Sequence, residues 1–311
     1  MLFSGNTQKN GFFTTNATGL PPRFGFRTEM PTFNQFLSTN SDTLKTLYLS
    51  LLTLLTPSVL IAQHLPDWHG RKCAVALTYD DALQVHLDKA IPALDAVGLK
   101  GTFYLAGNFP GLKARIADWK RAAANGHELG NHTLFHPCAG GPGREWVKPA
   151  HDLNTYTMAR ILDEIRMTNT LLEVMDAQKE RTFAFPCGDR MVEGKNYYEP
   201  VKQDFVAARG VVSRMQKAEN IDLTNVDAYV INGQTGEQMI ELVKQAIATN
   251  SVLVFLFHGV GGEHNLNVDE AEHKKLIQFL KQQDKEVWTA SFLDVAKSVK
   301  AFRQARQAPQ K

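Results

Sequence analysis

The stretch CAVALTYDD, residues 73–81, decides the fold of this chain. Its first part is an unbroken apolar run, and its end carries Asp80 and Asp81. A short apolar run is typical of a strand that is buried on both faces of a parallel sheet. In such sheets, functional polar residues follow the carboxyl ends of the strands. We therefore predict a buried strand over residues 73–79 and a polar site directly after it.

The same alternation of apolar runs and amphipathic stretches continues to the end of the chain. Residues 82–97 predict a helix, because Leu83, Leu87 and Leu94 share one face and Gly98 can end it. Further helices are predicted over 115–125, 155–175, 238–248 and 271–282, and further strands over 101–106, 182–185, 205–208, 251–257 and 287–290. Alternating strands and helices predict an α/β fold, a parallel sheet closed into a (β/α) barrel or a distorted relative.

Composition narrows the possible partners. The chain has 311 residues, of which 43% are hydrophobic and 21% charged, with a formal net charge of +2. These values are those of a globular protein with a sizeable core. A nearly balanced charge gives no reason to expect nucleic acid or an anionic membrane as partner.

The first sixty residues differ from the rest. Residues 1–43 show no clear periodicity, so we interpret them as an unstructured or mis-assigned extension, with Met30 as a more sensible start. Residues 47–62 are apolar and uncharged, follow Lys45 and end in small residues. This pattern predicts a signal peptide over about 44–62, cleaved after Ala62, and a secreted or periplasmic protein. The run is short for a membrane span and contains Pro57, so no stable membrane insertion is expected after cleavage, although an uncleaved anchor or a buried helix would also fit.

Two histidines form a second polar motif, HTLFHP at residues 132–137. His132 and His136 are four residues apart, a spacing that places both rings on one helical face or one turn. A carboxylate and two imidazoles can hold a divalent metal and leave coordination positions open for water and substrate. Adjacent Asp80 and Asp81 should point to different sides, one toward a metal and the other toward its water. The alternative is that both are solvated turn residues.

These motifs resemble those of the polysaccharide deacetylases with a NodB homology domain, carbohydrate esterase family 4. The first motif of that family corresponds to TYDD at 78–81, the second to HTLFHP at 132–137 and the last to LFH at 256–258. The third corresponds to AFPCG at 184–188, which keeps Pro186 and Gly188. The resemblance covers roughly residues 70–300. It implies a distorted (β/α) barrel of the NodB type and a single catalytic domain over 63–311.

The resemblance also implies roles for individual residues. Asp80 would be the general base, and His258 the general acid that protonates the leaving group. The metal would be bound by three side chains, Asp81, His132 and His136. The backbone N–H of Cys187 would stabilise the oxyanion. The metal would be Zn²⁺ by default for this ligand set.

The sequence departs from the family at two motifs. Ala184 stands where the family has an arginine that steadies the base, and Arg181 or Arg190 could replace it. The aspartate that pairs with the acid histidine in the family is not visible, and Asp222 and Asp227 are candidates for it.

Other residues have more than one interpretation. Trp146 lies in a polar loop and could stack on a sugar ring, with Pro186 as a second substrate contact. His264 could contact substrate at the rim of the site or simply be solvated. Two cysteines beside the motifs, Cys138 and Cys187, could form a disulfide or stay buried free thiols, as could Cys73.

The leading hypothesis is a secreted, metal-dependent hydrolase that removes N- or O-acetyl groups from a polysaccharide or oligosaccharide. A non-catalytic carbohydrate-binding relative is the alternative, motivated by the two departures. A two-histidine, one-carboxylate iron oxygenase is a third possibility. It fits less well, because the aspartate precedes the histidines and the pattern is α/β.

Overall fold

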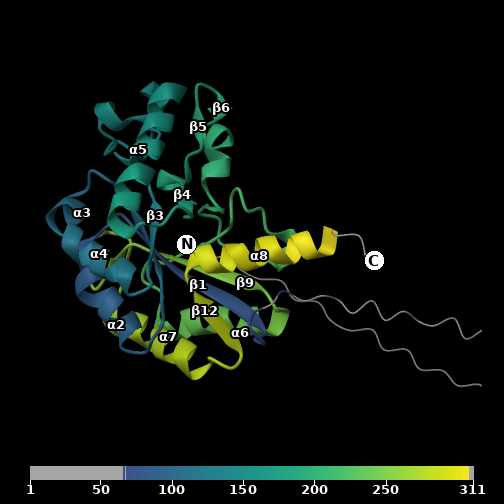
Figure 1. The fold of residues 1–311 in the computed structure, drawn as a ribbon. Helices are drawn as coiled ribbons and strands as arrows, with labels where there is room; N and C mark the ends of the chain where they lie inside the picture. Colours follow the sequence, from purple (N-terminus) through teal and green to yellow (C-terminus); the bar gives the residue numbers. More distant parts are fainter. Residues whose placement is uncertain (1–65, 67, 308–311) are drawn as a thin grey trace, which may run out of the picture. The chain divides into compact units, whose positions relative to one another are not determined.

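The computed structural model describes residue 66 and residues 68–307, and the predicted extension and signal peptide lie outside this range. The described residues form a curled parallel sheet with helices around it, the distorted (β/α) barrel predicted from the sequence (Figure 1). Its strand order is β7-β4-β3-β2-β1-β9-β8, with β12 also paired to β1. The strands are β1 (Cys73–Asp80), β2 (Thr102–Leu105), β3 (Glu128–Asn131), β4 (Phe183–Ala184), β7 (Ala208–Arg209), β8 (Tyr229–Val230), β9 (Val252–Phe257) and β12 (Val287–Ala290).

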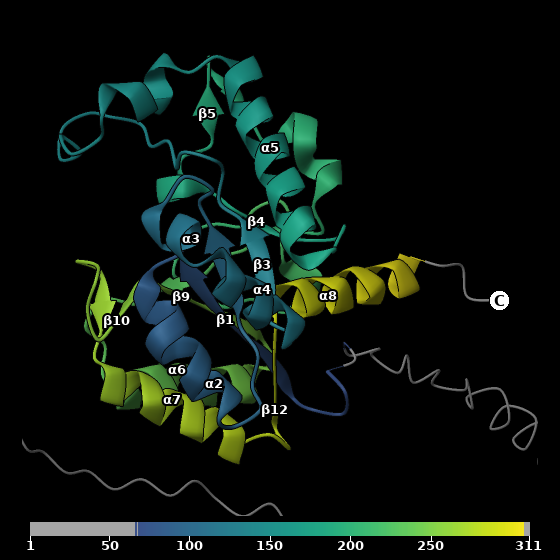
Figure 2. The same ribbon diagram turned by 60° about the vertical axis from the view of Figure 1, so that its left-hand side comes forward.

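Helices connect these strands and cover the sheet. They are a π-helical turn η1 (His86–Ala90), α2 (Ile91–Asp95), α3 (Pro110–Ala114), α4 (Ile116–Ala124), α5 (Met158–Asp176), α6 (Gly236–Thr249), α7 (Glu270–Gln282) and α8 (Phe292–Gln307). Two short pairs lie apart from the main sheet, β5 (Met191–Val192) with β6 (Lys195–Asn196), and β10 (Gly259–Val260) with β11 (Asn267–Val268). Figures 1 and 2 both place α6 and α7 at one end of the domain and α5 at the other. Among the described residues, no helix has the length and apolar character needed to cross a bilayer.

Strand β1 is the centre of the fold because it is buried along its whole length. It pairs in parallel with β2, β9 and β12. Its side chains alternate between two apolar clusters: Val75 and Leu77 belong to one, Ala74 and Ala76 to the other. Burial on both faces explains why this strand reads as a continuous apolar run.

Most predicted elements are confirmed to within a few residues, and the differences have local causes. The helix predicted from residue 155 begins at Met158, because Thr157 caps it and accepts a hydrogen bond from Arg160 N. The helix predicted over 82–97 is instead a π-helical turn followed by α2, with Pro92 in the first turn of α2. The strand predicted over 205–208 is shorter and later, β7, and residues 205–207 connect it to a 3₁₀ helix that ends at Asp204.

Candidate active site

All the polar motifs follow the carboxyl ends of parallel strands, so they meet at one edge of the sheet. Asp80 ends β1, His132 follows β3, the AFPCG motif continues from β4, and His258 follows β9. The parallel pairing of β1 with β9 and β2, and of β2 with β3, aligns these ends. The convergence predicted from the sequence is therefore present in the fold.

The two aspartates share one neighbour, His132, and otherwise face different groups: Asp80 pairs with Arg209, and Asp81 faces the other histidines. His132 Nε2 lies 3.8 Å from Asp80 Oδ2 and 3.6 Å from Asp81 Oδ1. The extended backbone stops at Asp80, and Asp81 has a φ of 80°, so strand alternation no longer applies to its side chain. A backbone hydrogen bond from Asp81 N to Tyr104 O, 3.1 Å long, joins this turn to β2.

The histidine motif is a loop, not the helix turn that its four-residue spacing permitted. Thr133 and His136 both have positive φ, 63° and 53°. Side chains brace this conformation: Asn131 Oδ1 accepts from Thr133 N at 2.8 Å, and Thr133 Oγ1 accepts from His136 N at 3.0 Å. The loop brings the two imidazole rings to 4.6 Å apart.

Asp81, His132 and His136 fit a divalent metal. Their ligand atoms lie within 4.8 Å of one another, and His136 Nε2 is 3.3 Å from Asp81 Oδ1. His132 Nδ1 is 2.8 Å from Ala184 O, a carbonyl that can only accept, so Nδ1 carries the proton and Nε2 presents its lone pair to the site. Within the described residues, Asp81 Oδ1 is buried without a hydrogen-bond partner, as expected of an atom whose partner is a cation.

Electrostatics support the same ligand set. Burial lowers the pKa of His132 to about 3 and that of His136 to about 4, so both rings are neutral ligands at neutral pH. Burial and the neighbouring charge of Asp80 raise the pKa of Asp81. A bound cation would favour its ionised form.

Arg209 is the residue that sequence reasoning missed. It is fully buried at the end of β7, and its Nη2 donates to both oxygens of Asp80, at 2.5 Å to Oδ1. Burial raises the pKa of Asp80, but the guanidinium more than reverses this effect, so the pKa falls to about 2. Asp80 therefore stays ionised beside the metal-ligand set.

The prediction that Arg181 or Arg190 steadies the base was wrong. Arg181 pairs with Asp176 and donates to Leu129 O at 2.9 Å, while the Arg190 guanidinium lies over the Phe185 ring. The sequence did carry a signal for Arg209. It is a charged residue directly after the largely apolar stretch 205–208, as Asp80 is after the run 73–79.

His258 lies on the other side of Asp81 from the histidine motif. Its Nε2 is 3.8 Å from Asp81 Oδ2, and its carbonyl is 2.8 Å from His86 Nε2. Among the described residues its Nδ1 is buried without a partner. The candidates for that partner are engaged elsewhere: Asp222 accepts from Thr224, and Asp227 pairs with Arg214. Burial lowers the pKa of His258 to about 4.

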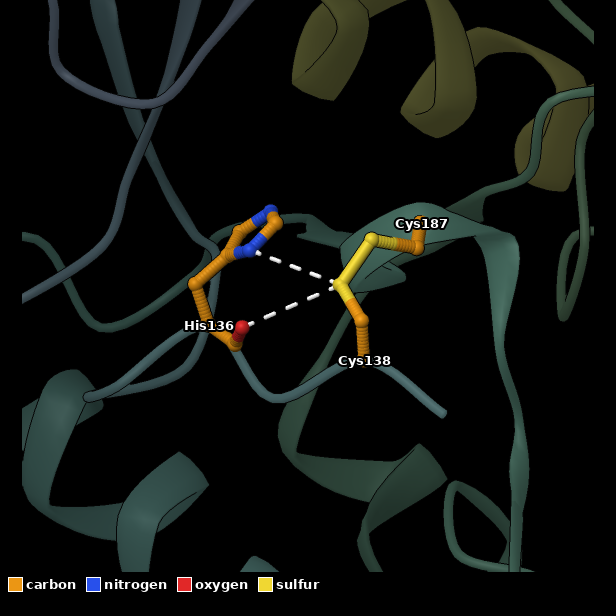
Figure 3. A group of neighbouring side chains, drawn as sticks. All are labelled: His136, Cys138 and Cys187. Atoms are coloured by element: carbon orange, nitrogen blue, oxygen red, sulfur yellow. Dashed lines mark hydrogen bonds between the residues drawn. A yellow bond between two sulfur atoms is a disulfide. The ribbon is translucent and has the colours of Figure 1, made fainter. Parts of the chain in front are cut away.

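A disulfide connects the second and third motifs. Cys138 and Cys187 are bonded with their Cα atoms 5.8 Å apart, so the disulfide interpretation is correct for this pair, while Cys73 is a buried free thiol. Figure 3 shows the His136 ring beside this bond, with Nδ1 3.7 Å from Cys138 Sγ. Cys187 has a φ of 56°, and the disulfide fixes this turn against the metal-ligand loop.

A cavity of about 400 Å³ opens beside His136. Trp146 belongs to its wall and is 62% exposed, whereas Pro186 is buried and is not part of the lining. The lining is Asn108, Phe109, Pro110, Phe135, His136, Cys138, Trp146, Val147, Lys148 and His151. The aromatic rings of this lining therefore lie next to His136 of the candidate metal site.

Residues 69–202 match the family model for polysaccharide deacetylase. The match covers less than half of the chain. An uncharacterized Bacillus subtilis protein, YlxY, is 32% identical over 103 residues, which are 33% of this chain and 27% of that protein. The chain thus spans about a quarter of the length of this relative.

Solved structures show that the deacetylase fold extends beyond the matched residues. A Mycobacterium smegmatis protein assigned to the polysaccharide deacetylases superposes with a TM-score of 0.53 at 15% identity, over 78% of this chain and 94% of that one. A Pseudomonas aeruginosa PAO1 protein with the same assignment gives 0.51 at 12% identity, also over 78% and 94%. At these identities the likeness concerns the fold alone.

Proposed function

We propose that this chain is a metal-dependent deacetylase that hydrolyses N- or O-acetyl groups of a polysaccharide or oligosaccharide. The observation that carries the proposal is Asp80, a buried carboxylate held ionised by Arg209 within 4 Å of His132 in the metal-ligand set. A carboxylate so placed can accept a proton from a water molecule that attacks an acyl group.

Each side chain then has a definite task. Asp81, His132 and His136 would bind the cation, with Zn²⁺ as the default for one carboxylate and two imidazoles. Such an ion lowers the pKa of a bound water and polarises the acetyl carbonyl. Asp80 would accept the proton of the attacking water, and the Cys187 N–H would face the developing oxyanion.

His258 would deliver a proton to the leaving nitrogen or oxygen. Its ring is neutral before the reaction, because burial lowers its pKa to about 4. It can therefore act as an acid only with a proton acquired during the reaction, such as the one removed from water by Asp80. The cavity lined by Trp146 would hold the neighbouring sugar units.

We also propose that residues 44–62 are a signal peptide, that 63–311 are the catalytic domain and that the protein is secreted or periplasmic. The apolar run before Ala62 supports this proposal. N-terminal sequencing of exported protein tests it, and a mature protein that still begins at residue 1 would contradict it.

A carbohydrate-binding protein without catalysis is the second candidate, favoured because Nδ1 of His258 has no hydrogen-bond partner in the part of the chain that the structure describes. Acetate release from acetylated xylan and from chitin oligosaccharides, with and without a chelator, separates the two candidates. The deacetylase releases acetate from one of them and loses this activity with the chelator, whereas the binding protein binds glycan without turnover.

The Asp80→Asn variant tests the assigned base. We expect acetate release to fall by about 10³-fold or more while the bound metal is retained. Metal content and a circular dichroism spectrum control for the loss of the Arg209 partner. Wild-type activity in this variant would refute the role of Asp80.

A further inference from the structure

The two carboxylate oxygens of Asp81 face two different pairs of histidines. Oδ1 lies 3.6 Å from His132 Nε2 and 3.3 Å from His136 Nε2. Oδ2 lies 3.8 Å from His258 Nε2 and 3.8 Å from His264 Nε2. The proposed function uses the first pair of histidines as metal ligands. The second pair, His258 and His264, forms a separate triad together with Asp81.

His264 belongs to a loop that is fixed over the site. Glu263 Oε2 accepts from Val85 N at 2.7 Å, and Lys89 Nζ donates to Gly261 O at 2.6 Å, so residues in and just before η1 hold this loop at two points. The backbone of Leu266 holds the His264 ring: Leu266 N donates to Nδ1 at 3.0 Å, and Leu266 O lies 3.3 Å from the same ring nitrogen. An ion that binds at Nε2 shifts the ring proton to Nδ1, where Leu266 O can accept it.

The rings of His258 and His264 are arranged as a pair. Their centroids are 4.6 Å apart and their planes differ by 14°, so both rings direct Nε2 at the same oxygen of Asp81. The three ligand atoms lie within 4.8 Å of one another. Two imidazoles and one carboxylate are a ligand set suited to Zn²⁺ and to the related ions Co²⁺ and Cu²⁺.

We propose that Asp81, His258 and His264 form a second site for a divalent transition metal, with Asp81 bridging the two sites, and that an ion bound there inhibits deacetylation. The inhibitory part rests on the proposed function, because the ion would occupy the Nε2 through which His258 delivers its proton. The second ion binds more weakly than the first, since the two cations repel each other and share the charge of Asp81.

Metal stoichiometry tests the site without reference to activity. Metal-free full-length protein is dialysed against a series of Zn²⁺ concentrations, and bound zinc is measured by mass spectrometry. We expect two ions per wild-type chain, one tight and one weak, and one tight ion in His264→Ala and in the more conservative His264→Gln. His151→Ala, a histidine outside both triads, should still bind two. A single ion in the wild-type chain, or two in both His264 variants, would overturn the proposal.

Activity measured along the same zinc series tests the inhibition. We expect acetate release by the wild-type protein to rise with the first equivalent and to fall by about tenfold or more as the second site fills. Each His264 variant is compared with its own rate at one equivalent and should not fall in this way. A second ion without inhibition would overturn the inhibitory role. A chain without deacetylase activity would instead refute the proposed function, and the stoichiometry would still decide the site.

Discussion

The two sides of Asp81 are built differently. On the side of β3, His132 is buried, its Nδ1–H is bound by Ala184 O, and its loop is braced by Asn131 and Thr133. On the side of β9, His258 has a buried Nδ1 without a partner among the described residues. A fixed tautomer suits a permanent metal ligand, whereas a ring without a fixed partner can exchange protons or accept a second ion.

Substituting one histidine on each side of Asp81 should give the largest difference between the two sides. We expect His132→Ala to lose the tight metal ion and all measurable acetate release, because it removes a ligand whose lone pair is pre-oriented. We expect His258→Ala to retain the tight ion while its rate falls by about 10²–10⁴-fold, the usual contribution of a general acid. Bound metal and initial rates check both. Equal loss of the tight ion in the two variants would show that the two sides do not differ.

The next largest effect, on stability and on the pH dependence of the rate, is expected from substituting Arg209. Arg209→Gln leaves Asp80 buried without its counter-charge, so we expect a loss of about 3–5 kcal/mol in the free energy of unfolding. The pKa of Asp80 should rise, which moves the acid limb of the rate profile to higher pH. Arg190→Gln is the matched control and should lower the unfolding free energy by no more than about 1 kcal/mol, the contribution of its contact with the Phe185 ring. Urea unfolding and a pH–rate profile measure these effects. Similar results for the two variants would show that Arg209 is not the counter-charge that keeps Asp80 ionised.

The disulfide is a further difference between the two sides of Asp81, because it braces only the loop that follows β3. Replacing both Cys138 and Cys187 with serine opens a loop spanning 49 residues, so we expect a loss of about 2–4 kcal/mol in unfolding free energy. The rate should fall with it, since His136 and the Cys187 turn lose their shared constraint. Cys73→Ser in the buried free thiol controls for the loss of a cysteine. An unchanged rate in the double variant would show that other contacts hold both loops.

Acid should weaken the metal-free protein. Burial lowers the pKa of seven histidines, among them His86, His136 and His258 to about 4 and His132 and His273 to about 3. Between pH 6.5 and 4 the unfolded chain therefore binds more protons than the folded one, so stability falls as pH falls. Asp81, Glu128 and Glu164 act in the opposite direction, because burial raises their pKa values, but the histidines outnumber them.

We expect the metal-free protein to lose about 2 kcal/mol or more between pH 7 and 5, measured by urea unfolding. The metal-loaded protein should lose more over the same interval, because protons compete with the metal for the histidines. Stability that stays constant or rises on acidification would contradict the neutral, buried state of these rings.

Family motifs and apolar runs were sufficient to predict the sheet, the edge at which the site lies and the candidate ligands Asp81, His132 and His136. These features depend on short stretches in which burial and chain direction are local consequences of the sequence. The CAVALTYDD stretch is predictable because a strand that is buried on both faces must consist almost entirely of apolar residues.

The tertiary structure decided what depends on residues far apart in the chain. Arg209 reaches Asp80 across 129 positions, and His264 reaches Asp81 through a loop held by η1. Neither contact leaves a periodic or motif signal, because an ion pair depends on where two strand ends meet and not on spacing along the sequence. The sequence alone determined the fold and the candidate metal-ligand set, and only the folded chain determined which groups complete the site around them.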